Sequence, residues 1–204
     1  MLLIMTIDVF AHFADLELSY QWIDMLKLIE ELETEVNAKH DEFGKRVIYQ
    51  VLNLPWPVAN RDLVLERTWD IDSQNKTVTA VYHSIDDNRR PMTKTNVRAW
   101  SPHTAWRFEH IDPLSIGDER NSYAFLGTKS KKFVESKKTN SGEACPSKSG
   151  RTFISLESVV DVKGSLPSWL VNYMQKTWPS KALNAFHTLA SSGQKPPHPQ
   201  LINW

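Results

Sequence analysis

The sequence has few of the features that would assign it at once to a class of protein. Only one of its 204 residues is cysteine, Cys145, and a lone thiol cannot form a disulfide within the chain. We therefore expect a reducing, cytoplasmic location. No apolar run approaches the ~20 residues of a membrane-spanning helix. The apolar first ten residues lack the basic start of a signal peptide and are interrupted by Asp8, so we expect them to face a core.

The chain also lacks an excess of charge of either sign. Lys and Arg together number 24, as do Asp and Glu, and the formal net charge is zero. A general nucleic-acid binder normally carries a basic excess, so no nucleic-acid partner is expected. Apolar residues make up 41% of the chain and charged residues 24%, which is typical of a globular protein with one sizeable core.

Catalytic and metal-binding motifs are missing as well. The seven histidines show neither HExxH nor HxH spacing, and no GxSxG, P-loop or GxGxxG sequence occurs. Cys145 has no histidine nearby in the sequence that would activate it as a nucleophile. We therefore expect no catalytic residue, no metal, no cofactor and no enzymatic activity.

What the sequence does contain is a change of pattern along the chain. Apolar residues at 7, 10, 13 and 16 have helical spacing and predict a helix within residues 6–24. Residues 25–36 fit either a helix or one face of a strand, and intrinsic propensity favours the helix. From residue 45 onward, short strand-like segments alternate with turn residues, which indicates an antiparallel meander. Within it, SPH at 101–103 predicts a hairpin connection.

The last third of the chain differs from this meander. Residues 112–150 are rich in Ser, Gly, Lys and Asn and are interpreted as a flexible insertion. A solvated loop is the favoured interpretation of its lysines, and attraction to anionic lipid is the alternative. After one more strand, the pattern predicts a long helix with Ser165 as its N-cap, Pro167 in its first turn and a bend at Pro179. Residues 192–204 form a proline-rich tail.

The predicted order is helices, then six or seven antiparallel strands, then one long C-terminal helix. A curved sheet around a long helix leaves a space that suits a ligand. Leu170, Met174 and Phe186 share one face of the predicted helix, so we expect them to form a wall of that space.

The turn LPWPVANRD, residues 54–62, ends in a charged pair at the mouth of a strand-like run. Pro55 and Pro57 restrict the backbone of the turn. We expect a structural role for the charged pair, in which Asp62 accepts backbone N–H groups of the turn and Arg61 bridges to a carboxylate or a carbonyl.

Three ordered motifs resemble those of the START family, the steroidogenic-acute-regulatory-related lipid transfer domains. In that family a Pro-aromatic-Pro turn precedes an Arg-Asp pair, as in LPWPVANRD. An Asp-x-x-Gly-x-x-Pro-x-Trp-Leu-x-Asn junction leads into its C-terminal helix, and here this junction consists of Asp161, Gly164, Pro167, Trp169, Leu170 and Asn172. DLELSYQWID, residues 15–24, resembles a third family segment.

The resemblance implies an α+β helix-grip fold, in which a strongly curved antiparallel sheet surrounds the C-terminal helix and encloses a lipid tunnel. Residues 1–191 would form this domain, with the insertion at 112–150 and the tail at 192–204. A strand is implied at 25–36, against the local propensity. The family's usual N-terminal helix and first strands have no counterpart, so we expect the strand within 151–162 to be an open sheet edge.

The resemblance also suggests which side chains would meet a lipid. Arg67 matches an arginine that sterol-type members pair with an acid, but the acid's position is Ile48, so Arg67 needs another polar partner. Gln50 matches a polar tunnel position of ceramide-type members, although a bond to neighbouring backbone is an equal alternative. Where members that hold phosphatidylcholine have an arginine and an aromatic cage, this chain has Ser19, Gln50, Leu65 and Val159, which disfavours a choline headgroup.

The expected function is the binding, and transfer between membranes, of one lipid: a phospholipid, sphingolipid or sterol. Its lipid-contacting residues would be Gln50, Leu65, Arg67, Leu170, Met174 and Phe186, and its fold-supporting residues Arg61, Asp62, Asp161, Gly164, Pro167 and Trp169. Contact with a membrane surface would be transient. The alternatives are a helix-grip enzyme of cyclase or hydrolase type, and a regulatory START-like module that carries no lipid.

Overall fold

The computed structural model describes residues 2–36, 43–111 and 151–192. Two helices come first, α1 (Leu2–Ala14) and α2 (Ser19–Trp22). The strands are β1 (Leu26–Val36), β2 (Phe43–Leu52), β3 (Asn60–Asp72), β4 (Thr77–Ser84), β5 (Asn96–Arg98), β6 (Trp100–Ile111) and β7 (Arg151–Asp161). The chain then forms α3 (Ser168–Asn172), a π-helical turn η2 (Tyr173–Thr177) and α4 (Trp178–Ser191). The insertion predicted at 112–150 and nearly all of the tail predicted at 192–204 lie outside the described residues.

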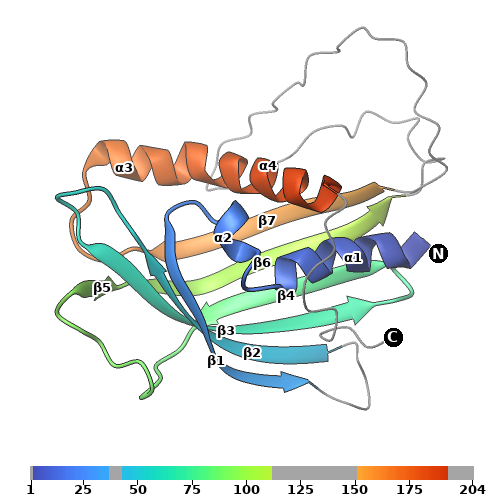
Figure 1. Cartoon of the computed structure of the whole chain (residues 1–204), viewed down its shortest axis with the longest axis horizontal. Coiled ribbons are helices and arrows are strands. Elements are labelled where there is room, and N and C mark those ends of the chain that lie inside the picture. Colours follow the sequence, from blue (N-terminus) through green and yellow to red (C-terminus); the bar gives the residue numbers. More distant parts are fainter. Residues whose placement is uncertain (1, 37–42, 112–150, 193–204) are drawn as a thin grey trace, which may run out of the picture.

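The strands form one curved sheet in the order β1-β2-β3-β4-β6-β7, and all these neighbours are antiparallel. The short β5 pairs in parallel with the start of β3. The C-terminal helical segment, from α3 to α4, runs along the same side of the sheet as α1 and α2 (Figure 1). This arrangement is the expected helix-grip fold. Among the described strands, β7 lies at one edge of the sheet and β1 at the other.

β1 is a strand, as the resemblance implied, and the helix favoured by local propensity was wrong. Its register with β2 shifts at two places, between Leu26 and Leu28 and between Glu31 and Glu33. Each shift interrupts the alternation of side chains between the two faces, so apolar residues do not repeat with period two. Pairing with β2 overrides the intrinsic preference of this segment.

The hairpin predicted at residues 101–103 was wrong, because β6 runs without interruption from Trp100 to Ile111. Its register with β7 shifts between Trp100 and His103, and this irregularity takes up Pro102. Proline has no N–H for a strand ladder, and a bulge is one of the few places within a sheet where it fits.

The C-terminal helix begins later than the sequence suggested. Pro167 occupies the N-cap position with φ −58° and ψ 141°, and the first helical residue is Ser168. The N-cap predicted at Ser165 was wrong, because a residue directly before proline avoids the α region and Leu166 therefore cannot begin a helix. A π-helical turn, η2, ends at Thr177, two residues before Pro179, and the bend expected at Pro179 stays a prediction.

The main core lies between the sheet and the helices, on what we call the inner face of the sheet. Alternate residues of β2, β3, β4, β6 and β7 point to this face, among them Ile48, Leu65, Trp69, Val78, Phe108 and Leu156. They pack against Phe10 and Phe13 of α1, Trp22 of α2, and Phe186 and Leu189 of α4. Burial of this inner face is the main source of stability.

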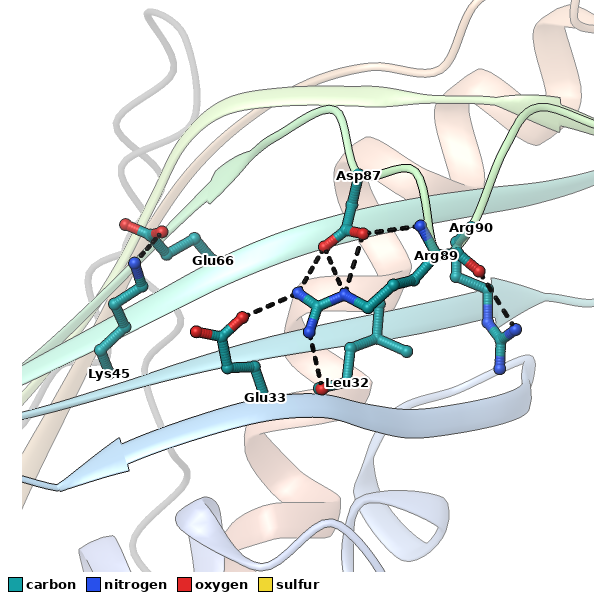
Figure 2. A network of polar contacts seen from close by, with 7 residues as sticks. All are labelled: Leu32, Glu33, Lys45, Glu66, Asp87, Arg89 and Arg90. Atoms are coloured by element: carbon teal, nitrogen blue, oxygen red, sulfur yellow. Dashed lines mark hydrogen bonds and ion pairs between the residues drawn. The ribbon is translucent and has the colours of Figure 1, made fainter.

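The outer face carries a smaller cluster, formed by Val47, Tyr49, Val51 and Val64 with Leu32 and Ile85 beside it. Arg89, in the loop after β4, bonds Asp87 in the same loop and Glu33 and the Leu32 carbonyl of β1 on this side of the sheet (Figure 2). On the same side, Lys45 of β2 pairs with Glu66 of β3. Exposed ion pairs of this kind contribute little individually. They lie on the opposite side of the sheet from the main core.

Candidate functional site

Three of the residues predicted to contact lipid lie together on the inner face. Register pairing places Gln50 of β2 opposite Leu63, and Leu65 of β3 opposite Ile48. Leu65 is buried in the main core, and Gln50 is half-buried. Arg67, two residues further along β3, is only 1% exposed. The structure therefore gathers two polar side chains and an apolar one on adjacent strands that face the helices.

The other three come from the C-terminal helical segment. Leu170 and Phe186 have no exposed surface, whereas Met174, in the π-helical turn, is half-buried. The Phe186 ring packs against Phe13, Trp22 and Phe108, with ring centroids 5.5 to 6.2 Å apart. Phe186 is thus the member of this set that joins the helix to the inner face of the sheet.

Aromatic rings fill the middle of the inner face. The Phe13 ring lies 5.1 Å from the rings of both Trp106 and Phe108 and 5.5 Å from that of Trp22. Phe10 packs beside it, 5.6 Å from Phe108. Because Phe10 and Phe13 belong to α1, this helix occupies part of the volume between the sheet and α4.

Arg67 is the largest fully buried side chain in the described part of the protein. One of its terminal nitrogens donates to the Ala14 carbonyl at 3.1 Å, and the other to the Tyr82 hydroxyl at 3.2 Å. Its guanidinium carbon lies 5.5 to 5.7 Å from the rings of Phe13, Trp69 and Tyr82. The sequence predicted that Arg67 needs a polar partner without identifying it. Its partners are a helix carbonyl, a phenol hydroxyl and three aromatic faces.

A second buried arginine, Arg46, lies directly across from Arg67 in the β2–β3 register. It also donates to the Ala14 carbonyl, at 2.9 Å, and its Nε lies 2.9 Å from a Glu31 carboxylate oxygen. Burial, followed by repulsion from Arg67, lowers the pKa of Arg46 to about 10. Two positive charges thus meet the same backbone oxygen at the end of α1.

Two open hollows of about 340 Å³ each lie along α2 and α4. The first is lined by residues 20–26 together with Lys181 and Ala185, and the second by Gln21, Ala185, Thr188, Leu189 and Ser192. Both are grooves open to solvent. They mark the line along which the C-terminal helix meets α2.

A polar contact closes one side of the first groove. The Tyr173 hydroxyl donates to the Asp24 carboxylate, and the Lys181 ammonium lies 3.1 Å from the Tyr173 oxygen and 3.5 Å from Asp24. The hydrogen bond to Tyr173 and the charge of Asp24 raise the pKa of Lys181. These three side chains tie the C-terminal helical segment to the chain just before β1.

Arg61 joins the predicted turn to the start of the C-terminal segment. Its Nε donates to the Val162 carbonyl at 2.8 Å, one terminal nitrogen donates to the Lys163 carbonyl at 3.0 Å, and the other donates to the Ala59 carbonyl. Burial lowers its pKa. The side chain bridges carbonyls, one of the two alternatives considered for it.

The rest of the motif surrounds this bridge. Asp62 accepts from Arg98 and from the Tyr49 hydroxyl, so the expectation of backbone N–H donors was wrong. Its side chain is turned toward the outer face, where Arg98 offers a guanidinium fork. Asp161 accepts from the Lys163 N–H, and Gly164 follows with φ 68°, a conformation that favours glycine.

The sequence reasoning missed Arg46 and the contact of Tyr173 with Asp24 and Lys181. The signal for Arg46 was its alternation with Ile48 and Gln50, which puts all three on one face of β2. Within residues 2–36, 43–111 and 151–192, no group of three or more His, Cys, Asp or Glu side chains could hold a metal. Among the same residues, no helix is long and apolar enough to span a membrane.

No protein-family model and no curated protein matches this chain. Solved structures do. Human STARD10 has a TM-score of 0.59 at 20% identity, over 92% of this chain and 59% of its own. The STAR-related lipid transfer protein of Xanthomonas axonopodis has 0.56 at 20% identity, over 91% of this chain and 78% of its own. The lipid transfer and protein localization domain of human StarD13 has 0.54 at 17% identity, over 91% and 71%.

The chain therefore spans less than two thirds of the STARD10 chain and somewhat more of the other two. At identities this low, the structural similarity establishes the fold alone. The chain has the fold of the START-related lipid transfer domains, and the resemblance seen in its motifs is confirmed at that level.

Proposed function

We propose that this protein binds one lipid between the inner face of the sheet and the C-terminal helical segment, and that it carries the lipid between membranes without transforming it. The observation that carries the proposal is the composition of the inner face. Apolar rows from five strands carry two separate polar side chains, the buried Arg67 and the half-buried Gln50, with the Ile48–Leu65 pair between them. An apolar chamber with a few placed polar groups is the usual make-up of a lipid site.

The headgroup is not choline, on this proposal. Choline recognition needs aromatic faces around a quaternary ammonium. Val159 is 52% exposed, and Ser19 is buried with its hydroxyl bonded to the Asp15 carbonyl. Arg67 already brings a positive charge to the aromatic rings of the inner face, which would repel a second cation.

Membrane contact is proposed for the end of the molecule where Arg61 joins two segments. Trp56, in the turn before β3, is 91% exposed, and Trp169, in α3, is 53% exposed. Arg61 bonds carbonyls of both segments, at Ala59 and Lys163. Tryptophan prefers the membrane–water interface, so two exposed tryptophans on linked segments favour a surface that touches lipid.

A second candidate is a START-like module that carries no lipid. The observation in its favour is the filling of the inner face by α1 and by the rings around Phe13. In this case the packed core would serve stability alone, and the exposed surfaces would carry the function.

Extraction of lipid from vesicles separates the two candidates. Donor vesicles would contain labelled phosphatidylcholine, an anionic phospholipid, ceramide and cholesterol in turn, and would be sedimented after incubation with the protein. We expect label other than phosphatidylcholine in the supernatant, together with protein. No extraction of any label would favour the module without lipid.

The same assay tests the membrane surface. Trp56→Ala should slow extraction several-fold without changing the melting temperature, since an exposed Trp supports little packing but anchors at the interface. Met92→Ala, at a side chain that is 78% exposed, is the matched control and should leave the rate unchanged. Equal rates for both variants would contradict this part of the proposal.

A further inference from the structure

α1 occupies the place where a lipid would lie in the proposed function. It contacts β4, β6 and β7 of the sheet and α4 above them (Figure 1). Ile7, Phe10, Phe13 and Ala14 are at most 5% exposed. One face of α1 is therefore largely apolar and packs against the side chains that would enclose an acyl chain, whereas Asp8 is exposed.

The end of this rod is polar and carries partial negative charge. The Ala14 carbonyl is at the C-terminus of α1, where unpaired carbonyls and the helix dipole are equivalent to roughly half an elementary negative charge. It accepts one hydrogen bond from Arg46 and one from Arg67. α1 thus has the two parts of an anionic lipid, an apolar body and a negative head.

The charges around this end are incompletely matched. Arg46 has Glu31 as an ion-pair partner, but Glu31 is 41% exposed at its side chain. In the described part of the chain, no carboxylate makes an ion pair with Arg67, and the buried Nε of Arg67 has no hydrogen-bond partner. The buried Asp15 is nearby, and one of its oxygens holds the Glu17 and Leu18 N–H groups while the other has no hydrogen-bond partner.

We propose that α1 is a plug helix that holds the place of a lipid with a carboxylate or phosphate head, and that such a lipid displaces it. The acyl chain replaces Phe10 and Phe13 among the inner-face rings. The headgroup replaces the Ala14 carbonyl on Arg46 and Arg67. A full negative charge with two or more oxygens satisfies two guanidinium groups better than one carbonyl does. The inference rests on the proposed function. It adds that the lipid is anionic and that it competes with α1 for the inner face.

A reversible lock on the plug helix tests the displacement. The hydroxyl oxygens of Thr6 in α1 and Thr152 in β7 are 3.2 Å apart, so cysteines at these positions lie within reach of a disulfide. The full chain with Thr6→Cys, Thr152→Cys and Cys145→Ser would be compared oxidised and reduced. The chain with Thr6→Cys and Cys145→Ser alone, treated with the same oxidant, is the control.

The probes are cis-parinaric acid, a fluorescent fatty acid, and the alcohol with the same chain. We expect the reduced protein to bind the acid, and the oxidised protein to bind it at least about 10-fold more weakly, since apparent affinity falls with the population of the competent state. Dithiothreitol should restore binding. Competition by phosphatidic acid or by oleate then distinguishes a phosphate head from a carboxylate head.

The same two probes test whether the positive charges of Arg46 and Arg67 bind the headgroup. Arg67→Met and Arg46→Met should each weaken the acid about 10-fold or more and the alcohol less than about 2-fold, since charge-assisted hydrogen bonds to a carboxylate are the strong ones. If either variant fails to fold, the comparison of acid with alcohol on the unaltered chain decides the same point. Phe13→Ala, which loosens the plug helix, should strengthen binding of the acid.

The outcomes separate this inference from the function on which it rests. Equal binding of the acid by oxidised and reduced protein overturns the plug helix and leaves lipid binding intact. Equal affinity of the unaltered chain for acid and alcohol overturns the anionic head. No binding of either probe by the reduced protein or by Phe13→Ala overturns the inference, and the extraction assay with ceramide, cholesterol and phospholipids then decides lipid binding independently.

Discussion

At the scale of single residues, two arginines with opposite tasks organise the molecule. Arg61 lies at the end of the sheet and donates hydrogen bonds to three backbone carbonyls. These bonds hold the turn before β3 against the junction after β7. Arg67 lies in the core and binds one carbonyl and one phenol. The first arginine supports the fold, whereas the second is buried at a cost that, on the proposed function, a bound headgroup offsets.

Arg61→Lys tests the structural task. A lysine keeps the charge but can reach one carbonyl at most, so two of the three part-buried carbonyl bonds are lost. We expect the free energy of unfolding to fall by about 2 kcal/mol, measured by urea denaturation. Arg107→Lys is the matched control, because Arg107 is half exposed and its Glu109 partner is 3.7 Å away. Equal midpoints for the two variants would show that the bridge adds no stability.

At the scale of elements, the sequence predicted some segments well and others only through their motifs. Periodicity alone predicted a helix within residues 6–24 and a meander from residue 45 onward. β1 could not be predicted locally, because its two bulges break the alternation of faces. The unbroken course of β6 was missed because Pro102 resembles a turn residue, and only pairing with its neighbours shows that it fits a bulge.

The candidate site was predictable in part for a related reason. Alternation along β2 and β3 places Gln50, Leu65 and Arg67 on one face, so their gathering followed from strand geometry. Arg46 was missed because a charged residue beside Lys45 resembles an exposed strand end. The position of α1 could not be read either, since amphipathic spacing shows that a helix is covered but not what covers it.

Phe186→Ala tests the packing of α4 on the inner face. Phe186 is fully buried among Phe13, Trp22 and Phe108, so its truncation should cost about 3–5 kcal/mol of unfolding free energy. Trp169→Ala, an equally drastic change on the same helical segment but at an exposed side chain, should cost less than about 1 kcal/mol. A similar loss of unfolding free energy for both variants, measured by chemical denaturation, would show that Phe186 is not the main packing contact of α4.

Tyr173→Phe tests the contact between the C-terminal helical segment and Asp24. The change removes one hydroxyl from a partly exposed network, so stability should fall by only about 1 kcal/mol. Lipid extraction should become faster, because the groove beside α2 opens more readily. Tyr20→Phe removes an exposed hydroxyl that accepts from the Ile29 N–H and is the control. An unchanged extraction rate in Tyr173→Phe would exclude this contact as a barrier to lipid entry.

At the scale of the whole molecule, the chain combines a fold used by lipid transfer domains with an inner face that is already packed. The sheet and the C-terminal helical segment form the grip, and α1 lies inside it (Figure 1). On the proposed plug mechanism, lipid replaces α1, so affinity for lipid would depend on how tightly this helix is held. Stability without lipid and readiness to take up lipid would then oppose each other.

Native mass spectrometry of the full chain after incubation with vesicles of mixed phospholipid, sphingolipid and sterol tests the central claim most directly. The account predicts a population of protein heavier by the mass of one lipid molecule, with phosphatidylcholine a minor species. Protein that stays at the mass of the bare chain with every lipid offered, under conditions in which it is folded, would contradict lipid binding.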